Sequence, residues 1–418
     1  MTKPYILDKI NGLRVILYPI KGLPAVKANL VIRAGSSYEE GKDWGAFHFI
    51  EHLTFHQTKK FKNKLELELF KEEYGLNNNA GTGREDISYY TYGPSSSFKQ
   101  ALELLYELVF EPVIPEEVME REIEVIRQEY NDKWDSPHNR FQRAFEEQHF
   151  GKSHRYTRDG MGQPEYIASL SRDDLRELHG KYFVNENCVL SLTGDFEVEE
   201  AKRMVRDIFV GNQGGLSRPR RGEIKSGERE FIYRDDVQQD TAVLSWLVPG
   251  FMELPLRERF AMWIAGYIVG GSTRSKLFRR LREELGLVYR CGASRKLNPY
   301  AGYFEVWSSN SPQSTSRVFE EMRKETYGFV EKPIEEKMYK RSLNYLKSNI
   351  SLSFDSIGRI SESITYNYFW EKKVYLPDDD IKLLLTISEK EVREVLGRYV
   401  RPENEYVSLM TAKEKAGS

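Results

Sequence analysis

Cysteine is scarce in this chain, and so are long hydrophobic runs and net charge. Only two cysteines, Cys188 and Cys291, occur among 418 residues, and they form no Cys-x-x-Cys pair, which removes the basis for a disulfide framework or a thiolate metal site. The 62 Lys and Arg residues nearly balance the 64 Asp and Glu residues, leaving a formal net charge of −2 at pH 7. Because no basic field covers the whole chain, we expect no nucleic-acid partner.

No stretch reaches the roughly 18 uncharged apolar residues that indicate a membrane-spanning helix. The densest apolar run, residues 261–271, is short and rich in glycine. The first twenty residues carry charges and an Asn11-Gly12 turn signal, where an export signal would need an uninterrupted apolar run. These absences predict that the protein has no membrane partner and is soluble and cytoplasmic.

Strands and helices alternate in both halves of the sequence. Residues rich in β-branched side chains predict strands at 12–20 and 25–34, and a plausible cap at Asp43 predicts a helix that ends near Thr54. The other predicted strands are 86–92, 188–193, 241–248 and 303–308, and the other predicted helices are 64–74, 97–110, 115–134, 197–210, 256–268 and 275–284. With 40% hydrophobic residues to fill a core, this mixture favours an α+β fold.

Residues 211–228 interrupt this order with five Gly, one Pro and a cluster of basic side chains, which is typical of a linker. No aromatic residue is interleaved for base stacking, so the basic cluster favours a solvated connector over a nucleic-acid patch. The linker separates domains at 1–210 and 229–418. Because the element order after it resembles the order before it, we predict two structurally similar, pseudo-duplicated α/β-sandwich domains.

The segment with the clearest chemical signal is His48-Phe49-Ile50-Glu51-His52. Residues four apart on a helix lie on one face with Cβ atoms roughly 6 Å apart, so both imidazoles can bind one metal ion. Glu51 projects beside the same place, where its carboxylate can take a proton from water at the metal. This H-x-x-E-H order is the inverzincin signature. The alternative is a helix with two partly exposed histidines and a solvated glutamate.

A tetrahedral catalytic zinc usually has three protein ligands and one open position, so two histidines require a third donor. The predicted helix 115–134 offers Glu122 and Glu129, which lie about 10 Å apart along one face. One could bind the metal while the other holds a histidine ligand by a hydrogen bond. Alternatively, each glutamate belongs to a solvated acidic face.

These motifs in this order resemble the pitrilysin-like inverted-zinc metallopeptidases, of the short-chain type related to the mitochondrial processing peptidase. The resemblance covers the whole chain and includes further segments at 79–85, 160–167 and 192–195. The second half is similar to the family's catalytically inert repeat at 270–271, 275–278, 281–283 and 286–289.

The resemblance implies a zinc-dependent endopeptidase with one Zn²⁺ per chain and peptides as substrates. It implies that Glu129 is the third zinc ligand beside His48 and His52. It also implies that Glu51 is the catalytic base and that Glu122 is the partner of a histidine ligand.

The resemblance further implies that Asn79 and Ala80 bind the scissile region of an extended peptide. Backbone hydrogen bonds along a strand hold any sequence, while pockets select side chains. Arg282 and Tyr289 match a pair with which the family's inert domain binds substrate. Without the family, an ion pair at Arg282 and a core position for Tyr289 would be the simpler interpretation.

The sequence departs from the family pattern at two places. His56-Gln57-Thr58 replaces a Lys-Gly-Thr run, and Gly81 replaces an aromatic residue within the Asn-Ala segment. His56 could approach the site, but three ligands suffice, so we predict that it is not a ligand. Gly81 removes the basis for transferring the family's subsite preference.

The resemblance also implies an assembly in which the chain is half of a clamshell, and two such halves enclose a chamber. Because the chain keeps both the zinc set and the pair Arg282 and Tyr289, we predict a homodimer. Two alternatives are a non-catalytic binding or assembly subunit of the same fold, and a processing peptidase that needs a different partner chain.

Overall fold

The structure is a computed structural model that describes residues 3–211, 214 and 223–413. It divides into two compact units, and neither unit is one continuous stretch of chain. Unit 1 is built from the described residues of Met1–Trp134, Ser153–Glu223 and Ser353–Tyr375, and unit 2 from those of Asp135–Lys152, Ile224–Leu352 and Leu376–Ser418. The predicted linker, 211–228, lies partly outside the described residues.

Each half of the sequence contributes one helix to the unit that the other half mainly forms. Helix α5 (Pro137–Phe150) packs in unit 2, and helix α12 (Ile357–Glu371) packs in unit 1. The predicted boundaries at 1–210 and 229–418 follow the linear order of the elements, whereas the compact units exchange these two helices.

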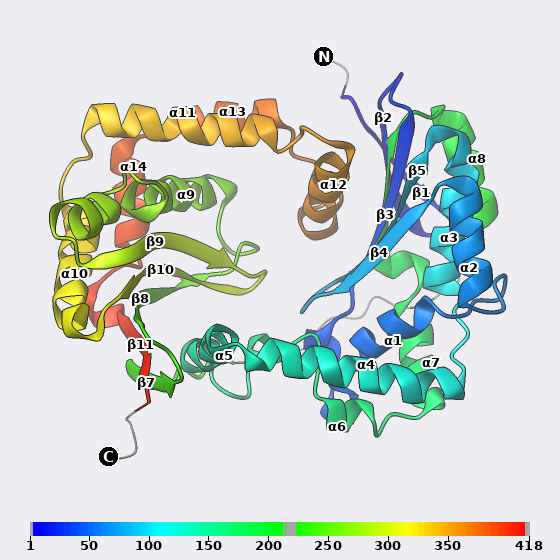
Figure 1. Ribbon diagram of the computed structural model, residues 1–418. Coiled ribbons are helices and arrows are strands. Elements are labelled where there is room, and N and C mark those ends of the chain that lie inside the picture. Colours follow the sequence, from blue (N-terminus) through cyan, green and yellow to red (C-terminus); the bar gives the residue numbers. More distant parts are fainter. Residues whose placement is uncertain (1–2, 212–213, 215–222, 414–418) are drawn as a thin grey trace. The chain divides into compact units, whose positions relative to one another are not determined.

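Unit 1 contains a six-stranded sheet in the order β1-β2-β6-β3-β5-β4, with β4 at one edge (Figure 1). All neighbours are antiparallel except β2 and β6, which are parallel. The Asn11-Gly12 turn joins β1 to β2, and both residues have positive φ, as a tight hairpin requires. The strands are β1 (Ile6–Ile10), β2 (Leu13–Pro19), β3 (Ala25–Ile32), β4 (Asn77–Thr82), β5 (Ile87–Pro94) and β6 (Cys188–Gly194).

The two faces of this sheet have different partners because side chains alternate along each strand. Val26, Ala28 and Leu30 of β3 point into the main apolar core of the unit. Two of the alternate residues are polar and meet α12: Lys27 binds Glu362 at 2.9 Å, and Asn29 binds Thr365 at 3.1 Å. The exchanged helix therefore covers a face whose buried polar groups need hydrogen-bond partners.

The other helices of unit 1 include every helix predicted in the first half of the sequence, and two further helices, 164–167 and 172–182, that were not predicted. Gly75 ends α2 in the left-handed conformation with φ 64°, as its position after the helix predicts. Ser171 and Asp174 form a capping box at the start of α7. The helices are α1 (Ala46–Thr54), α2 (Lys64–Tyr74), α3 (Phe98–Phe110), α4 (Glu116–Asp135), α6 (Pro164–Ile167), α7 (Arg172–Tyr182) and α8 (Val198–Ile208).

Unit 2 contains a five-stranded sheet in the order β7-β11-β8-β10-β9. One face of it packs on a second apolar core with α9, α10, α11, α13 and α14. The strands are β7 (Glu230–Asp235), β8 (Asp240–Pro249), β9 (Val288–Leu297), β10 (Ala301–Asn310) and β11 (Tyr406–Ala412), and the helices are α9 (Leu256–Gly270), α10 (Thr315–Glu331), α11 (Glu336–Leu352), α13 (Pro377–Thr386) and α14 (Glu389–Gly397). The helix predicted at 275–284 is wound as a π-helix over Phe278–Glu284.

Helix α5 covers the opposite face of this sheet and is anchored there by buried polar contacts. His149 donates from Nδ1 to the carbonyl oxygen of Phe145 (2.7 Å) and accepts at Nε2 from the hydroxyl of Ser245 on β8 (2.8 Å). Arg140 binds Asp235 of β7 through two hydrogen bonds of 2.8 and 2.9 Å. Two sheets, each sandwiched between helices, confirm the predicted α+β class with two similar domains.

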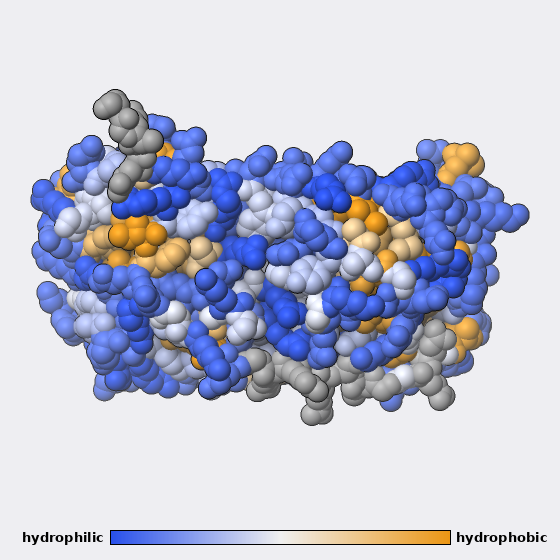
Figure 2. All heavy atoms as spheres, turned by 90° about the horizontal axis from the view of Figure 1, so that it is seen from below, coloured by the Kyte–Doolittle hydropathy of each residue, from blue (hydrophilic) through white to orange (hydrophobic). Residues whose placement is uncertain are grey.

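Most of the face seen in Figure 2 is hydrophilic, and its apolar residues form separate patches. This agrees with a sequence in which 30% of residues are charged. None of the helices in the part of the chain that the structure describes has the length and apolar character needed to cross a bilayer.

Candidate metal centre

Helix α1 presents the H-x-x-E-H segment, and its first turn is capped from outside the helix. The helix begins at Ala46 after Gly45, whose φ of 99° is left-handed. The carboxylate of Glu39 accepts hydrogen bonds from the N–H groups of Gly45 (2.9 Å) and Phe47 (3.0 Å). The predicted cap at Asp43 is wrong, because Asp43 ends a separate 3₁₀ turn over Gly41–Asp43.

Glu39 is fully buried, and burial raises its pKa to about 8 even though the two N–H groups favour the charged form. The positive end of the α1 dipole, where Glu39 lies, also favours its charged form and so opposes the effect of burial. Sequence reasoning missed this residue because a cap is usually sought at the residue before the helix, and Glu39 lies several residues earlier.

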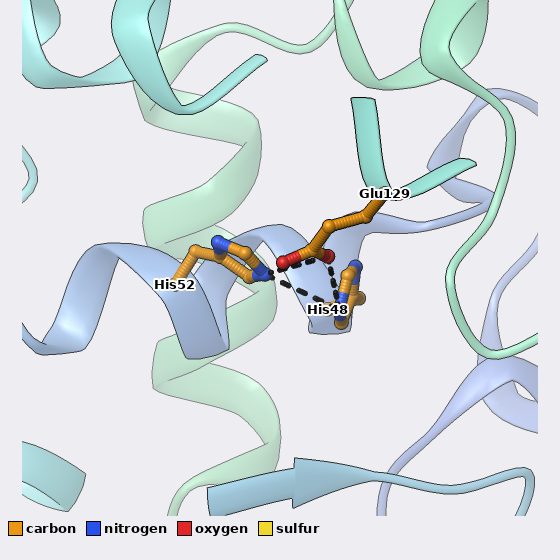
Figure 3. Close-up of side chains that lie close together, drawn as sticks. All are labelled: His48, His52 and Glu129. Carbon is orange, nitrogen blue, oxygen red and sulfur yellow. Dashed lines mark hydrogen bonds and ion pairs between the residues drawn. The ribbon is translucent and has the colours of Figure 1, made fainter. Parts of the chain in front are cut away.

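Three side chains from two helices converge at one point (Figure 3). The Nε2 atoms of His48 and His52 lie 3.3 Å apart, and Oε2 of Glu129 on α4 lies 3.8 Å from the first and 3.5 Å from the second. One ligand atom from each residue lies within 4.8 Å of the other two. Helix α4 thus brings the carboxylate of Glu129 to the point where the two imidazoles converge.

Glu122, two turns earlier on α4, is not one of the three clustered residues and bonds to two imidazoles. Its Oε2 lies 2.9 Å from Nδ1 of His52, and its Oε1 lies 2.9 Å from Nε2 of His56. The carboxylate can only accept, so Nδ1 of His52 carries the proton and Nε2 keeps its lone pair toward the point of convergence. The contact between His56 and Glu122 was not foreseen, and three histidines spaced four residues apart are the signal that could have indicated it.

The protonation states in this centre suit a divalent cation. Burial, together with the neighbouring His52, lowers the pKa of His48 to about 4, so its imidazole is neutral at physiological pH. Neutral imidazoles and a carboxylate are zinc ligands, and an oriented second partner such as Glu122 normally accompanies them. The donor set therefore fits zinc.

Glu51 lies beside the donor set on the same helix, and burial raises its pKa. The hydroxyl of Thr82, the last residue of β4, donates a hydrogen bond to Oε2 of Glu51 at 2.5 Å. Sequence reasoning did not single out Thr82, although it lies three residues after Asn79 in a segment that carried the family resemblance.

Asn79 and Ala80 lie on β4, which pairs only with β5 and leaves its other edge open in the described sheet. Their register partners are Tyr90 and Tyr89. Asn79 is exposed, whereas Ala80 packs partly against the core. An open edge next to Glu51 is the arrangement that β-addition of a peptide requires.

Arg282 and Tyr289 lie together in unit 2. The guanidinium of Arg282 stands 5.3 Å from the ring centre of Tyr289 and donates to the carbonyl oxygen of Val288 at 2.9 Å. Tyr289 is 58% exposed, so the alternative of a core position is wrong. It lines a cavity of about 750 Å³ together with Phe141 and Phe145 of α5, Trp307 and Glu305 of β10, and neighbouring residues.

Comparisons with protein families match two segments of the chain. Residues 14–158 match the model described as "Insulinase (Peptidase family M16)", and residues 169–346 match the one described as "Peptidase M16 inactive domain". All the residues of the convergent site on α1, β4 and α4 fall in the first segment. Tyr289 and Arg282 fall in the second.

Relatives with similar sequences cover nearly the whole chain. An uncharacterized zinc protease of Rickettsia bellii is 27% identical over 399 residues, which is 93% of each chain. The mitochondrial-processing peptidase subunit beta of Bos taurus is 25% identical over 424 residues, covering 96% of this chain and 82% of that one.

Solved structures share the fold. A protease from Helicobacter pylori has a TM-score of 0.85 at 17% identity, covering 97% of this chain and 99% of its own. A peptidase M16 inactive domain from Pseudomonas fluorescens has a TM-score of 0.87 at 16% identity, covering 98% of both. At these identities the similarity establishes the fold alone.

Proposed function

This chain belongs to the M16 family of peptidases, and from that premise we propose that it is a zinc-dependent endopeptidase that hydrolyses peptides or unfolded segments. The observation that carries the proposal is the convergence of His48, His52 and Glu129 within 4.8 Å, with Glu51 on the same helix. One zinc ion per chain follows from one such donor set among the described residues.

The proposed reaction divides the work between the metal and the side chains. When bound, zinc would polarise the scissile carbonyl and lower the pKa of water from about 15.7 toward 7. Glu51 would accept the proton of the attacking water and return it to the leaving amine. Glu122 would keep His52 in the tautomer that presents Nε2 to the metal.

Substrate would bind through its backbone and through side chains. The open edge of β4, at Asn79 and Ala80, offers main-chain hydrogen bonds to an extended peptide of any sequence. Arg282 and Tyr289 would bind peptide from unit 2, and the cavity beside Tyr289 is lined by aromatic rings that suit an apolar side chain.

The experiment that tests this function measures zinc and peptide hydrolysis together. The purified wild-type chain should hold one zinc per chain and cleave a fluorogenic peptide library in a chelator-sensitive way. Glu51→Gln should keep the zinc and lose about 10²- to 10⁴-fold in turnover, because a general base typically contributes that much. Near-normal cleavage by Glu51→Gln would show that another group is the base.

The rival function, a non-catalytic binding or assembly subunit, makes the opposite prediction of no bound zinc and no hydrolysis. The phrase "inactive domain" describes the model that matches 169–346, which contains none of the convergent donors. The complete donor set in the other segment supports the enzyme. A processing peptidase with a different partner would hydrolyse peptide only when that partner is added.

We also propose that the active form is a cytoplasmic homodimer enclosing a chamber, which would restrict substrates to peptides and unfolded segments. Each copy carries both the donor set and the Arg282 and Tyr289 pair, so either copy could serve either role. Static light scattering should give twice the 48.9 kDa mass of one chain. A stable monomer that still cleaves peptides would refute the dimer.

A further inference from the structure

Thr82 joins two parts of the site that are distant in sequence. It ends β4, the strand at the open edge of the sheet, and its hydroxyl donates to Oε2 of Glu51 at 2.5 Å. Thr82 thus holds one carboxylate oxygen of Glu51, Oε2, and leaves Oε1 for the proton transfer proposed above.

A glutamate that acts as a base needs such a restraint. The terminal torsion of a glutamate side chain is broad, so an unrestrained carboxylate samples many orientations. Proton abstraction requires the carboxylate oxygen within about 2.6–3.2 Å of the water. The short hydrogen bond from the Thr82 hydroxyl reduces that freedom before substrate arrives.

The position of Thr82 is itself tightly held from two other loops. A Cβ added to Gly160 would lie 2.9 Å from the carbonyl oxygen of Thr82, and one added to Gly35 would lie 2.6 Å from that of Gly83. The N–H of Ser36 bonds to the oxygen of Gly83 at 3.3 Å. These close backbone approaches keep the end of β4 in place relative to α1.

We propose that Thr82 is a positioning residue for Glu51, linking the orientation of the base to the strand along which an extended peptide would bind. The inference rests on the proposed peptidase function. It assigns the hydroxyl a role in turnover that is separate from zinc binding and from peptide affinity. Among the described residues the hydroxyl bonds to Glu51 and to none of the three donors, and a side-chain hydroxyl takes no part in the main-chain hydrogen bonds by which a peptide would add to β4.

The test compares Thr82→Val, which keeps the shape and removes the hydroxyl, with Thr82→Ser, which keeps the hydroxyl. Thr82→Val should lower kcat about 10- to 100-fold, the effect of losing a hydrogen bond to a charged group, with KM and zinc content unchanged. Thr82→Ser should restore most of the kcat. Thr91→Val is the matched control, since the buried hydroxyl of Thr91 on β5 bonds only to the carbonyl oxygen of Ala101 (2.8 Å) in the structure.

Several outcomes would overturn the proposal while leaving the peptidase function intact. These are a wild-type kcat in Thr82→Val, an equal loss in Thr82→Ser, or a loss that follows zinc content. If Thr82→Val does not fold, the same comparison is made between Thr82→Ala and Thr82→Ser. A wild-type chain that binds zinc but hydrolyses no peptide would instead refute the proposed function on which the inference rests.

Discussion

Glu122 provides the sharpest test of the proposed metal centre, because we propose that it supports zinc binding without being a ligand. It is largely buried, and its two oxygens each bond to an imidazole nitrogen at 2.9 Å, one on His52 and one on His56. Removing its charge should therefore weaken zinc binding through His52 alone and leave the three ligand atoms in place.

The magnitude follows from the bond to Nδ1 of His52. A hydrogen bond to a charged group contributes about 1.5–3 kcal/mol and a neutral one about 0.5–1.5 kcal/mol. Glu122→Gln keeps an acceptor for His52 but loses the charge, so we expect roughly tenfold weaker zinc binding. Glu122→Ala leaves the half-buried Nδ1–H of His52 without its acceptor. We therefore expect roughly 100-fold weaker zinc binding, which is the upper end of the loss on removing such a partner of a metal ligand.

Competition with a chromophoric zinc chelator at fixed pH and ionic strength measures these affinities. Glu124→Gln is the control, because Glu124 lies on the same helix, its side chain is 66% exposed and it pairs at 3.4 Å with Arg127. His56→Gln should cost less than Glu122→Gln, because His56 acts on His52 only through the carboxylate. Zinc affinity in Glu122→Ala within a factor of about two of wild type would refute the reasoning.

Three further predictions concern stability, each measured by urea denaturation of the zinc-free protein. Burial lowers the pKa of His149 to about 4, so its contribution to stability should be present above pH 6.5 and lost as pH falls toward 4. His149→Gln should flatten the dependence of the unfolding free energy on pH in this range. An unchanged slope would show that His149 does not cause it. Arg140 lowers the pKa of Asp235 to about 2, so this pair should stabilise unit 2 above pH 4 and fail as pH falls toward 2, and Asp235→Asn should remove that part of the acid transition. Glu39→Gln keeps one side-chain oxygen in place of two, which leaves one of the two N–H groups that start α1 without an acceptor and should lower the free energy of unfolding by about 1–3 kcal/mol. Because burial raises the pKa of Glu39 to about 8, wild-type stability relative to this variant should decrease as pH rises from 5 to 8, and a difference independent of pH would show that Glu39 does not titrate there.

Local patterns predicted much of the fold and the centre of the site. The spacing of His48 and His52 places both imidazoles on one helix face, because helical geometry depends only on neighbouring residues. Strand and helix positions followed from periodicity and caps, and Gly75 ended α2 as expected. The helical spacing of Glu122 and Glu129 also indicated this pair, but it did not determine which of the two completes the donor set.

Contacts between segments that are distant in sequence decided the remaining features of the site. The fold brings Oε2 of Glu129 to within 3.8 Å of both histidine Nε2 atoms and turns Glu122 toward His52 and His56. It also assigns the cap of α1 to Glu39 and the restraint of Glu51 to Thr82.

The exchange of α5 and α12 between the units is likewise a tertiary feature. Each covers a sheet face whose buried polar side chains need partners from a remote part of the chain. The sequence by itself determined which residues form helices and strands and which could bind a metal, because those properties depend on neighbours a few residues away. Only the tertiary structure decided which side chains meet, because hydrogen bonds and packing between remote segments form only when the whole chain folds.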